Sequence, residues 1–191
     1  KSLYNYIVKP IGERYNNKIK IGNKNLIINT EVYNHQYVNR ESNIISIPLY
    51  NTLSLQQGSK VLIHHNVFRR WHNAKGVEKN SRGYLNENEY LVSPNQIFAY
   101  YDTKWKAIKG YTFVKPIVSD KVYEKEKPLI GIVKYSTVFN DNQVVGFTPS
   151  SEFEFVINGE RLYRVMDQFI TINYGHKTNE KEYNPSWAQS C

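Results

Sequence analysis

The feature that most limits the possible folds is an ordered set of short sequence blocks that occurs twice. Each set opens on a proline-containing strand, IVKPI or FVKPI, continues with a turn and a β-branched run, and closes on a longer apolar block that is expected to be a single strand. The first set is Ile7–Ile11, 58–66 and Leu91–Tyr101, and the second is Phe113–Ile117, 144–149 and Leu162–Ile172. Three matched blocks in the same order predict a duplicated β module.

The pattern between these blocks favours an all-β fold with long hairpin loops and very little helix. No window shows sustained 3.6-residue periodicity with caps, whereas the 16 tyrosines and the Val/Ile runs favour strands. Period-2 alternation on both sides of Gly22-Asn23 predicts a hairpin over 18–29, and Asn158-Gly159 predicts a tight hairpin turn. Residues 66–84 are expected to form a long hairpin or loop.

The repeat divides the 191 residues into two modules. We expect a first module over residues 1–101 and a connector over 102–110. A second, shorter module then covers 111–173. Residues 174–191 are polar with scattered aromatics, and we expect them to form an arm that drapes over another surface.

Composition excludes few partners. The net charge is +8, which permits polyanion binding, but the lysines are spread along the chain and mixed with glutamates, as on a solvated surface. The single cysteine, Cys191, allows no internal disulfide, and no apolar run reaches the length of a membrane helix. With no signal-peptide pattern, we expect the protein inside a cell or an assembled particle.

One basic-aromatic cluster stands out, at Arg69, Arg70 and Trp71. On a loop tip, these residues could grasp a phosphate backbone or stack a base. Alternatively, the aromatic packs down and the arginines face water, and a third possibility is the lining of an opening in a ring. Solvation is the favoured interpretation, so nucleic acid is not among the expected partners.

No constellation for catalysis or metal binding is evident. His64 and His65 are expected to be neighbours in a strand, where their side chains would point to opposite faces and could not chelate one ion. Paired carboxylates do not stand out, and Cys191 at the chain end is a poor nucleophile candidate. We expect neither catalytic residues, nor a metal, nor a cofactor, and therefore no enzyme.

The order of blocks resembles the chaperonin-10, or GroES-like, co-chaperonin family, over about residues 6–173. In that family a V-K-P-like strand, a β-branched strand, a glycine turn leading into a strand and an E-x-L closing segment follow one another. The first module matches them with 7–10, 43–47, 57–63 and 89–99, and the second with 113–116, 131–133, 142–147 and 160–171. The Tyr/Asn-rich composition is similar to bacteriophage versions of the family, and the two modules resemble its double-domain members.

The resemblance implies two tandem GroES-like small β-barrels that assemble into a ring and cap a chaperonin. Family members grip the chaperonin through an apolar tripeptide on a flexible loop, and Leu26, Ile27 and Ile28 occupy the matching place. The alternation over 18–30 favours an ordered hairpin there instead. The second module departs from the pattern, because 119–128 is short and charged, with only Val122 and Tyr123 apolar.

Two functions from different classes follow. One is a non-enzymatic, oligomeric co-chaperonin-like protein, phage-encoded, that helps to fold virion proteins. The other is a structural component of a phage particle, such as a capsid, neck or tail protein, built on the same tandem fold. The missing grip in the second module and the tyrosine-rich end over 174–191, which could clasp a neighbouring subunit, favour this second function. Both functions place the protein in the host cytoplasm or the virion, with copies of itself and a chaperonin or virion proteins as partners.

Overall fold

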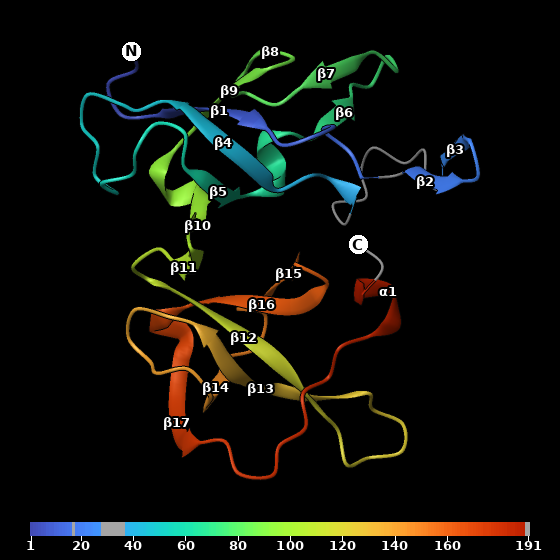
Figure 1. Ribbon diagram of the computed structural model, residues 1–191, viewed down its shortest axis with the longest axis vertical. Helices are drawn as coiled ribbons and strands as arrows, with labels where there is room; N and C mark the ends of the chain where they lie inside the picture. The colour runs from blue at the N-terminus through green and yellow to red at the C-terminus, as the bar shows by residue number, and fades with distance from the viewer. Residues whose placement is uncertain (17, 28–36, 190–191) are drawn as a thin grey trace. The chain divides into compact units, whose positions relative to one another are not determined.

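The computed structural model describes residues 1–16, 18–27 and 37–189 (Figure 1). The chain divides into two compact units, Lys1–Lys104 and Trp105–Cys191. Antiparallel strands dominate both, which confirms the all-β class. Among the described residues, helix is confined to α1 (Ser186–Gln189) and short 3₁₀ turns.

The first unit is built on one large sheet and two small hairpins. The sheet has the order β11-β10-β5-β4-β1-β9-β8, and the chain passes from the first unit to the second within β11. Its strands are β1 (Tyr6–Pro10), β4 (Glu41–Ser46), β5 (Lys60–Ile63), β8 (Tyr84–Asn86), β9 (Glu89–Val92), β10 (Ile97–Asp102) and β11 (Lys104–Ala107). The hairpins are β2 (Lys18–Ile21) with β3 (Lys24–Ile27), and β6 (Arg70–His72) with β7 (Glu78–Asn80).

The second unit holds a six-stranded sheet with the order β15-β16-β12-β13-β14-β17. Its strands are β12 (Tyr111–Val118), β13 (Glu126–Tyr135), β14 (Gln143–Phe147), β15 (Phe153–Ile157), β16 (Glu160–Met166) and β17 (Ile170–His176). When strands are matched by their order along the chain, β10-β5-β4-β1-β9-β8 in the first unit corresponds to β17-β14-β13-β12-β16-β15 in the second.

The agreement extends to single residue pairs. In β1, Val8 faces Ile44 and Tyr90, and in β12, Val114 faces Val133 and Tyr163. Both opening strands shift register one residue before this valine, between Ile7 and Val8 and between Phe113 and Val114. The last strands shift register in the same way: Ile97 and Ala99 of β10 pair with Ile63 and Leu62, and Ile170 and Ile172 of β17 pair with Phe147 and Gly146.

Apolar side chains on the inward faces of these strands form the core of each unit. Val8 and Val114 are completely buried. Their partners in neighbouring strands, Tyr90 and Val133, are buried as well. Burying one such side chain contributes about 1.5–3 kcal/mol, so the period-2 pattern fixes which face turns inward. In the second unit Val145, Phe147 and Val165 complete the cluster.

The prolines of the opening strands sit where a missing N–H costs little. Pro10 and Pro116 pair with Ser42 and Gly131 on one side, but the neighbouring strands β9 and β16 stop pairing at Val8 and Val114. Pro10 is the last residue of β1, where a missing donor is tolerated. Pro116 lies inside β12, and beside it the C-terminal segment takes the place of β16, because Tyr183 N donates to Pro116 O.

Two expected strands are interrupted. Each closing block, Leu91–Tyr101 and Leu162–Ile172, was expected to be a single strand, but a 3₁₀ turn divides it, at Pro94–Gln96 and Asp167–Phe169. The first turn is started by Ser93, which forms a reciprocal capping box with Gln96 ahead of Pro94. This turn lets β9 and β10 join opposite sides of the sheet, which an unbroken strand could not do.

Three further features bear on the expected connector, barrels and C-terminal arm. The stretch expected to be a connector, 102–110, contains β11. Closed barrels are not confirmed, because the described pairings leave edge strands on each sheet, β8 and β11 in one and β15 and β17 in the other. The expected C-terminal arm begins as part of β17 and then returns along its own unit, where Val118 N donates to Lys181 O at 2.8 Å and Tyr183 N to Pro116 O at 2.9 Å.

Gly131 is required by a close approach of two strands. A Cβ at this position would lie 2.7 Å from Val114 Cγ2 and 3.0 Å from Lys115 O. We expect Gly131→Ala to lower the free energy of unfolding by about 1–3 kcal/mol, because the added methyl group overpacks the site. Urea denaturation of the whole chain measures the effect.

Ser42, which holds the corresponding position in β4, provides the matched control. It is fully buried, and its hydroxyl has no hydrogen-bond partner within the described residues. Removing an unsatisfied buried hydroxyl should leave stability unchanged or raise it. A loss from Ser42→Ala as large as that from Gly131→Ala would contradict the proposed clash.

Candidate functional site

The basic-aromatic cluster lies on the β6–β7 hairpin of the first unit. Asn73 forms the turn, since its Oδ1 accepts hydrogen bonds from the backbone N of Lys75 at 3.0 Å and Val77 at 2.9 Å. Gly76 has a φ of +74°, a conformation that favours glycine. Asx-type bonding therefore closes a hairpin that has no counterpart between β14 and β15.

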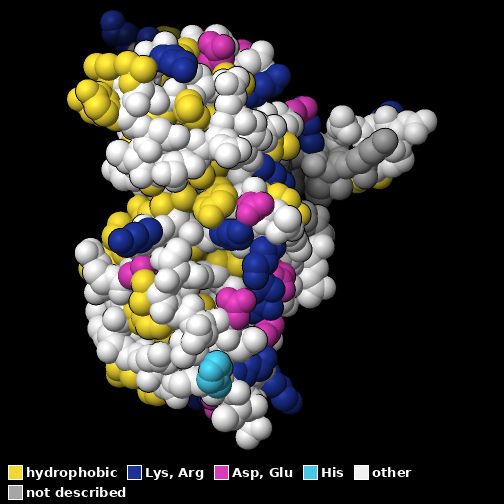
Figure 2. All heavy atoms as spheres, turned by 60° about the vertical axis from the view of Figure 1, so that its left-hand side comes forward, with side chains coloured by type: hydrophobic (Ala, Val, Ile, Leu, Met, Phe, Trp, Pro, Cys, Tyr) yellow, Lys and Arg dark blue, Asp and Glu magenta, His cyan; other side chains and the backbone are white. Residues whose placement is uncertain are grey.

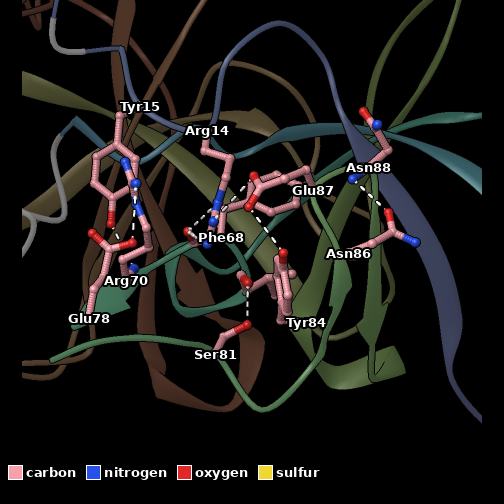
Figure 3. Close-up of polar contacts among 11 residues, drawn as sticks. Arg14, Tyr15, Phe68, Arg70, Glu78, Ser81, Tyr84, Asn86, Glu87 and Asn88 are labelled. Carbon is pink, nitrogen blue, oxygen red and sulfur yellow. Dashed lines mark hydrogen bonds and ion pairs between the residues drawn. The ribbon is translucent and has the colours of Figure 1, made fainter. Parts of the chain in front are cut away.

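Arg70 is held by its own unit. Its guanidinium lies 3.4 Å from Glu78 and 5.0 Å from the ring centre of Tyr15, and its backbone N donates to the Tyr15 hydroxyl at 2.7 Å (Figure 3). A carboxylate and an aromatic ring both stabilise the cation in place. Arg70 thus has a structural role.

Arg69 and Trp71 lie on the other side of the strand. Successive side chains of a strand point to opposite faces, so these two residues share a face that Arg70 does not. Both line a groove of about 730 Å³, together with Arg82. The predicted triplet is therefore divided: the structure brings Arg69 and Trp71 together with Arg82, which sequence reasoning missed, and separates Arg70 from them.

A buried arginine fixes the base of this hairpin. Arg14 is only 9% exposed and donates to Phe68 O at 2.9 Å from Nη2 and at 3.3 Å from Nε. Its guanidinium lies 3.6 Å from Glu87 and over the rings of Tyr84 and Tyr90, at 5.6 and 5.2 Å (Figure 3). Burial raises the pKa of Tyr90 to about 12, so this phenol stays neutral. No sequence signal marks Arg14, because Phe68 is 54 residues away.

The histidine prediction was wrong in its geometry. β5 ends at Ile63 and a 3₁₀ turn begins at His65, so the two histidines are not consecutive strand residues. Their rings stack with centroids 4.4 Å apart, and His64 Nδ1 accepts from Asn66 N at 3.1 Å. In the described part of the chain, no three His, Cys, Asp or Glu side chains gather as metal ligands would.

The apolar tripeptide is described only in part. Leu26 and Ile27 belong to β3, Leu26 is 53% exposed, and Ile28 lies outside the described residues. Ile19 faces Leu26 and Ile21 faces Lys24, so Ile21 and Leu26 share one face of the hairpin. Ile21 is 61% exposed, and the hairpin pairs with no other described strand (Figure 1). The hairpin alternative therefore holds over Lys18–Ile27.

In the second unit the corresponding connection, between β12 and β13, is the short loop 119–125. Val122 and Tyr123 are 92% and 99% exposed there. Both connections that follow an opening strand thus present apolar side chains to solvent, on a hairpin in one unit and on a charged loop in the other.

Ion pairs hold the C-terminal segment to the second unit. Lys115 Nζ lies 2.9 Å from Glu160 and 2.7 Å from Glu182, and these carboxylates also meet Lys134 and Lys177. Burial opposes the charge on Lys115, but hydrogen bonds to Glu182 and Glu160 outweigh it and raise its pKa. Hydrogen bonds from Lys115 and Lys177 lower the pKa of Glu182.

A second network surrounds Arg161, which contacts Glu126 at 2.6 Å, Glu154 at 2.7 Å and the Tyr163 hydroxyl at 2.6 Å. Burial and a hydrogen bond with Glu126 raise the pKa of Tyr163. Opposite charges lie interspersed on the face drawn in Figure 2, as these pairs would produce. Such matched groups stabilise the unit and leave no acid–base pair poised for catalysis among them.

Arg14 provides a test of the hairpin base. We expect Arg14→Met to lower the free energy of unfolding by about 1–3 kcal/mol, because Phe68 O is left buried without its donors. The exposed Arg82 is a matched control, since Arg82→Met removes the same charge without these bonds. Chemical denaturation compares the two, and equal losses would show that net charge, not the buried contact, is responsible.

The Lys115 network predicts a pH dependence. Glu160 and Glu182 have a pKa below the ordinary 4.5, so their contribution is present above that value and is lost as the pH falls through and below it. We expect Lys115→Met to cost about 1 kcal/mol near neutral pH and to flatten this acid decline. Lys9→Met, an exposed residue in the corresponding position, should do neither. An unchanged acid decline in Lys115→Met would contradict the assignment.

None of the described helices is long and apolar enough to cross a membrane.

Comparison with known proteins adds no relative. No family model, curated protein or solved structure matches this chain. The likeness to co-chaperonins thus remains a resemblance carried by the residues quoted above.

Proposed function

We propose that the protein is a non-enzymatic, oligomeric co-chaperonin-like protein, encoded by a bacteriophage, that caps or assists a chaperonin in folding virion proteins. In this proposal each unit is a GroES-like β-barrel module, and the chain carries two in tandem. The common strand order and the matched register shifts support two copies of one module. Shape and assembly, not reactive groups, would then carry the function.

The observation that carries the proposal is the β2–β3 hairpin. It follows the opening strand, where the family carries its chaperonin-binding segment, and it presents Ile21 and Leu26 to solvent from one face. An apolar face on an element with few other contacts can enter a hydrophobic groove of a partner. Leu26, Ile27 and Ile28 are the proposed contact residues.

One reason to consider a structural role in a phage particle was that the tyrosine-rich C-terminal segment could clasp a neighbouring subunit. The described part of that segment is engaged within its own unit. Arg161 N donates to Asn184 Oδ1 at 3.0 Å, Asn184 Nδ2 to Gly159 O at 2.9 Å, and Ala188 is completely buried. These bonds remove the main support for a clasp, so we favour the co-chaperonin role.

Binding to a chaperonin tests the proposal. We expect the purified protein to bind a bacterial chaperonin in the presence of ATP, measured by co-sedimentation or negative-stain imaging. Replacing Leu26, Ile27 and Ile28 together by serine should reduce binding at least tenfold, since about 1.4 kcal/mol is a factor of 10 and three apolar contacts are lost. The matched control replaces Leu3, Leu49 and Tyr50, which are 53–62% exposed, by serine and should leave binding intact.

Two results would overturn the proposal. Absence of binding with every nucleotide state would remove the chaperonin partner. Unchanged binding by the Leu26, Ile27 and Ile28 variant would remove the hairpin from the contact. In that second case a Val122→Ser, Tyr123→Ser variant shows whether the loop of the second unit makes the contact instead.

A further inference from the structure

The groove beside the β6–β7 hairpin is unlike the rest of the surface. It has a volume of about 730 Å³ and lies within the first unit, between the hairpin, the segment 81–83 and the β9–β10 connection. The described lining residues include two arginines and a tryptophan and no carboxylate. They are Asn5, Asn66, Val67, Arg69, Trp71, Ser81, Arg82, Gly83, Leu91, Ser93, Asn95 and Gln96.

Charge is concentrated here. Residues 69–82 hold five Lys and Arg side chains and one carboxylate, Glu78, which lies against Arg70 on the other side of the strand. Trp71 is 44% exposed although indole is among the most apolar side chains, so its ring is available to a ligand. A basic surface with an accessible aromatic ring is the combination that single-stranded nucleic acids require.

We propose that this groove binds single-stranded nucleic acid, with a base stacked on Trp71 and phosphates paired with Arg69 and Arg82. This inference does not depend on the co-chaperonin role. Stacking needs a base that is not already covered by its neighbours in a duplex, which selects a single strand. The amides of Asn5 and Asn66, which also line the groove, can donate to and accept from base edges.

The groove is held open by the fold. Ser81 Oγ donates to Val67 O at 2.6 Å, which ties the returning segment to the 3₁₀ turn at His65–Val67. Leu91 N donates to Gly83 O at 2.7 Å, and a Cβ on Gly83 would lie 2.3 Å from Leu91 O, so only glycine allows this approach. A site with fixed walls loses less conformational freedom when a ligand binds.

The comparison of the two units also singles out this groove. The second unit follows the same strand order but passes from β14 to β15 without a hairpin equivalent to β6–β7. The scaffold therefore does not need the hairpin for its own strand pairing. The segment 69–82, which includes this hairpin, carries five cations and an exposed tryptophan, and a ligand explains them better than folding does.

An acidic peptide is the competing ligand, because it too would pair with the arginines. It would leave the indole face and the amide side chains without partners suited to them, and a nucleotide satisfies all three groups at once. The nucleic acid is therefore favoured, and the peptide becomes an outcome of the test.

The experiment titrates the whole protein into a fluorescein-labelled oligothymidylate of about 15 nucleotides and follows fluorescence anisotropy and tryptophan emission. We expect saturable binding with quenched emission. Trp71→Ala should weaken binding about tenfold and abolish the quenching, whereas Trp71→Phe should retain most of the affinity. Trp105, which is buried, and Trp187, which is 46% exposed, both belong to the second unit and contribute a background that the Trp71→Ala variant measures.

Arginine variants separate the groove from net charge. Arg69→Gln with Arg82→Gln should weaken binding and reduce the dependence of log affinity on log salt by about 1.4, as expected for two lost phosphate contacts on a single strand. Arg70 is adjacent in sequence but lies outside the groove. Arg70→Gln removes one charge that acts only at long range, so the affinity should stay within about twofold of that of the unchanged protein.

Several outcomes would overturn the proposal. These are no binding at about 50 mM salt, equal losses from Arg70→Gln and each groove arginine, or undiminished binding by Trp71→Ala. Tighter binding of a duplex than of the oligothymidylate would also reject a single strand as the ligand. So would tighter binding of an oligoglutamate peptide that competes fully with the oligothymidylate. Circular dichroism of each variant confirms that the fold is intact before its affinity is interpreted.

Discussion

Each sheet depends on the pairing of its opening strand with a neighbour on both sides. β1 lies between β4 and β9, and β12 lies between β13 and β16, so removal of either strand would separate a sheet into two parts. Val8 and Val114 are buried, and they pair with Ile44 and Tyr90 in one sheet and with Val133 and the partly buried Tyr163 in the other. Hydrophobic burial and hydrogen bonding act on the same few residues.

In both units a guanidinium lies over the ring of a tyrosine, but the arginine comes from a different element in each. Tyr90 and Tyr163 hold matching positions opposite Val8 and Val114, and a guanidinium lies over each ring. In the first unit the cation is Arg14, from the connection after β1, and in the second it is Arg161, from the same strand as the tyrosine. A cation over an aromatic ring is attracted by the ring's electron density, and the fold accepts that cation from either source.

Much of the fold could be predicted from the sequence, because strand alternation and turn residues are local signals. The opening strands, the Gly22-Asn23 and Asn158-Gly159 hairpins and the all-β class follow from such patterns. The 3₁₀ turns after β9 and β16 were missed, although Ser93-Pro94 was a visible signal for the first. The histidine geometry was missed for a related reason, since the end of β5 at Ile63 depends on the chain turning away from the sheet.

The candidate site was predicted only as a cluster of residue types. Arg69, Arg70 and Trp71 were correctly singled out as adjacent in the sequence, but strand alternation places Arg70 against Glu78 and the others in the groove. Arg82 and Arg14 were not found, because their roles depend on contacts across the first unit that no spacing encodes. Strand patterns do not encode the chemistry of a partner, so they do not predict that Leu26, Ile27 and Ile28 contact a chaperonin.

The near-identical opening strands carry a risk during synthesis on the ribosome. Ile7–Ile11 and Phe113–Ile117 could exchange places, since inter-domain misassembly is a common failure of repeated folds. Phe113 discriminates against that exchange: its buried ring packs against Tyr135 and Phe155, with centroid distances of 6.2 and 5.7 Å, whereas Ile7 in the corresponding place is only half-buried. A swapped chain would still place a lysine, Lys9, beside Glu160 and Glu182, but it would leave a cavity where the ring of Phe113 packs, so side-chain volume and not charge favours the native strand.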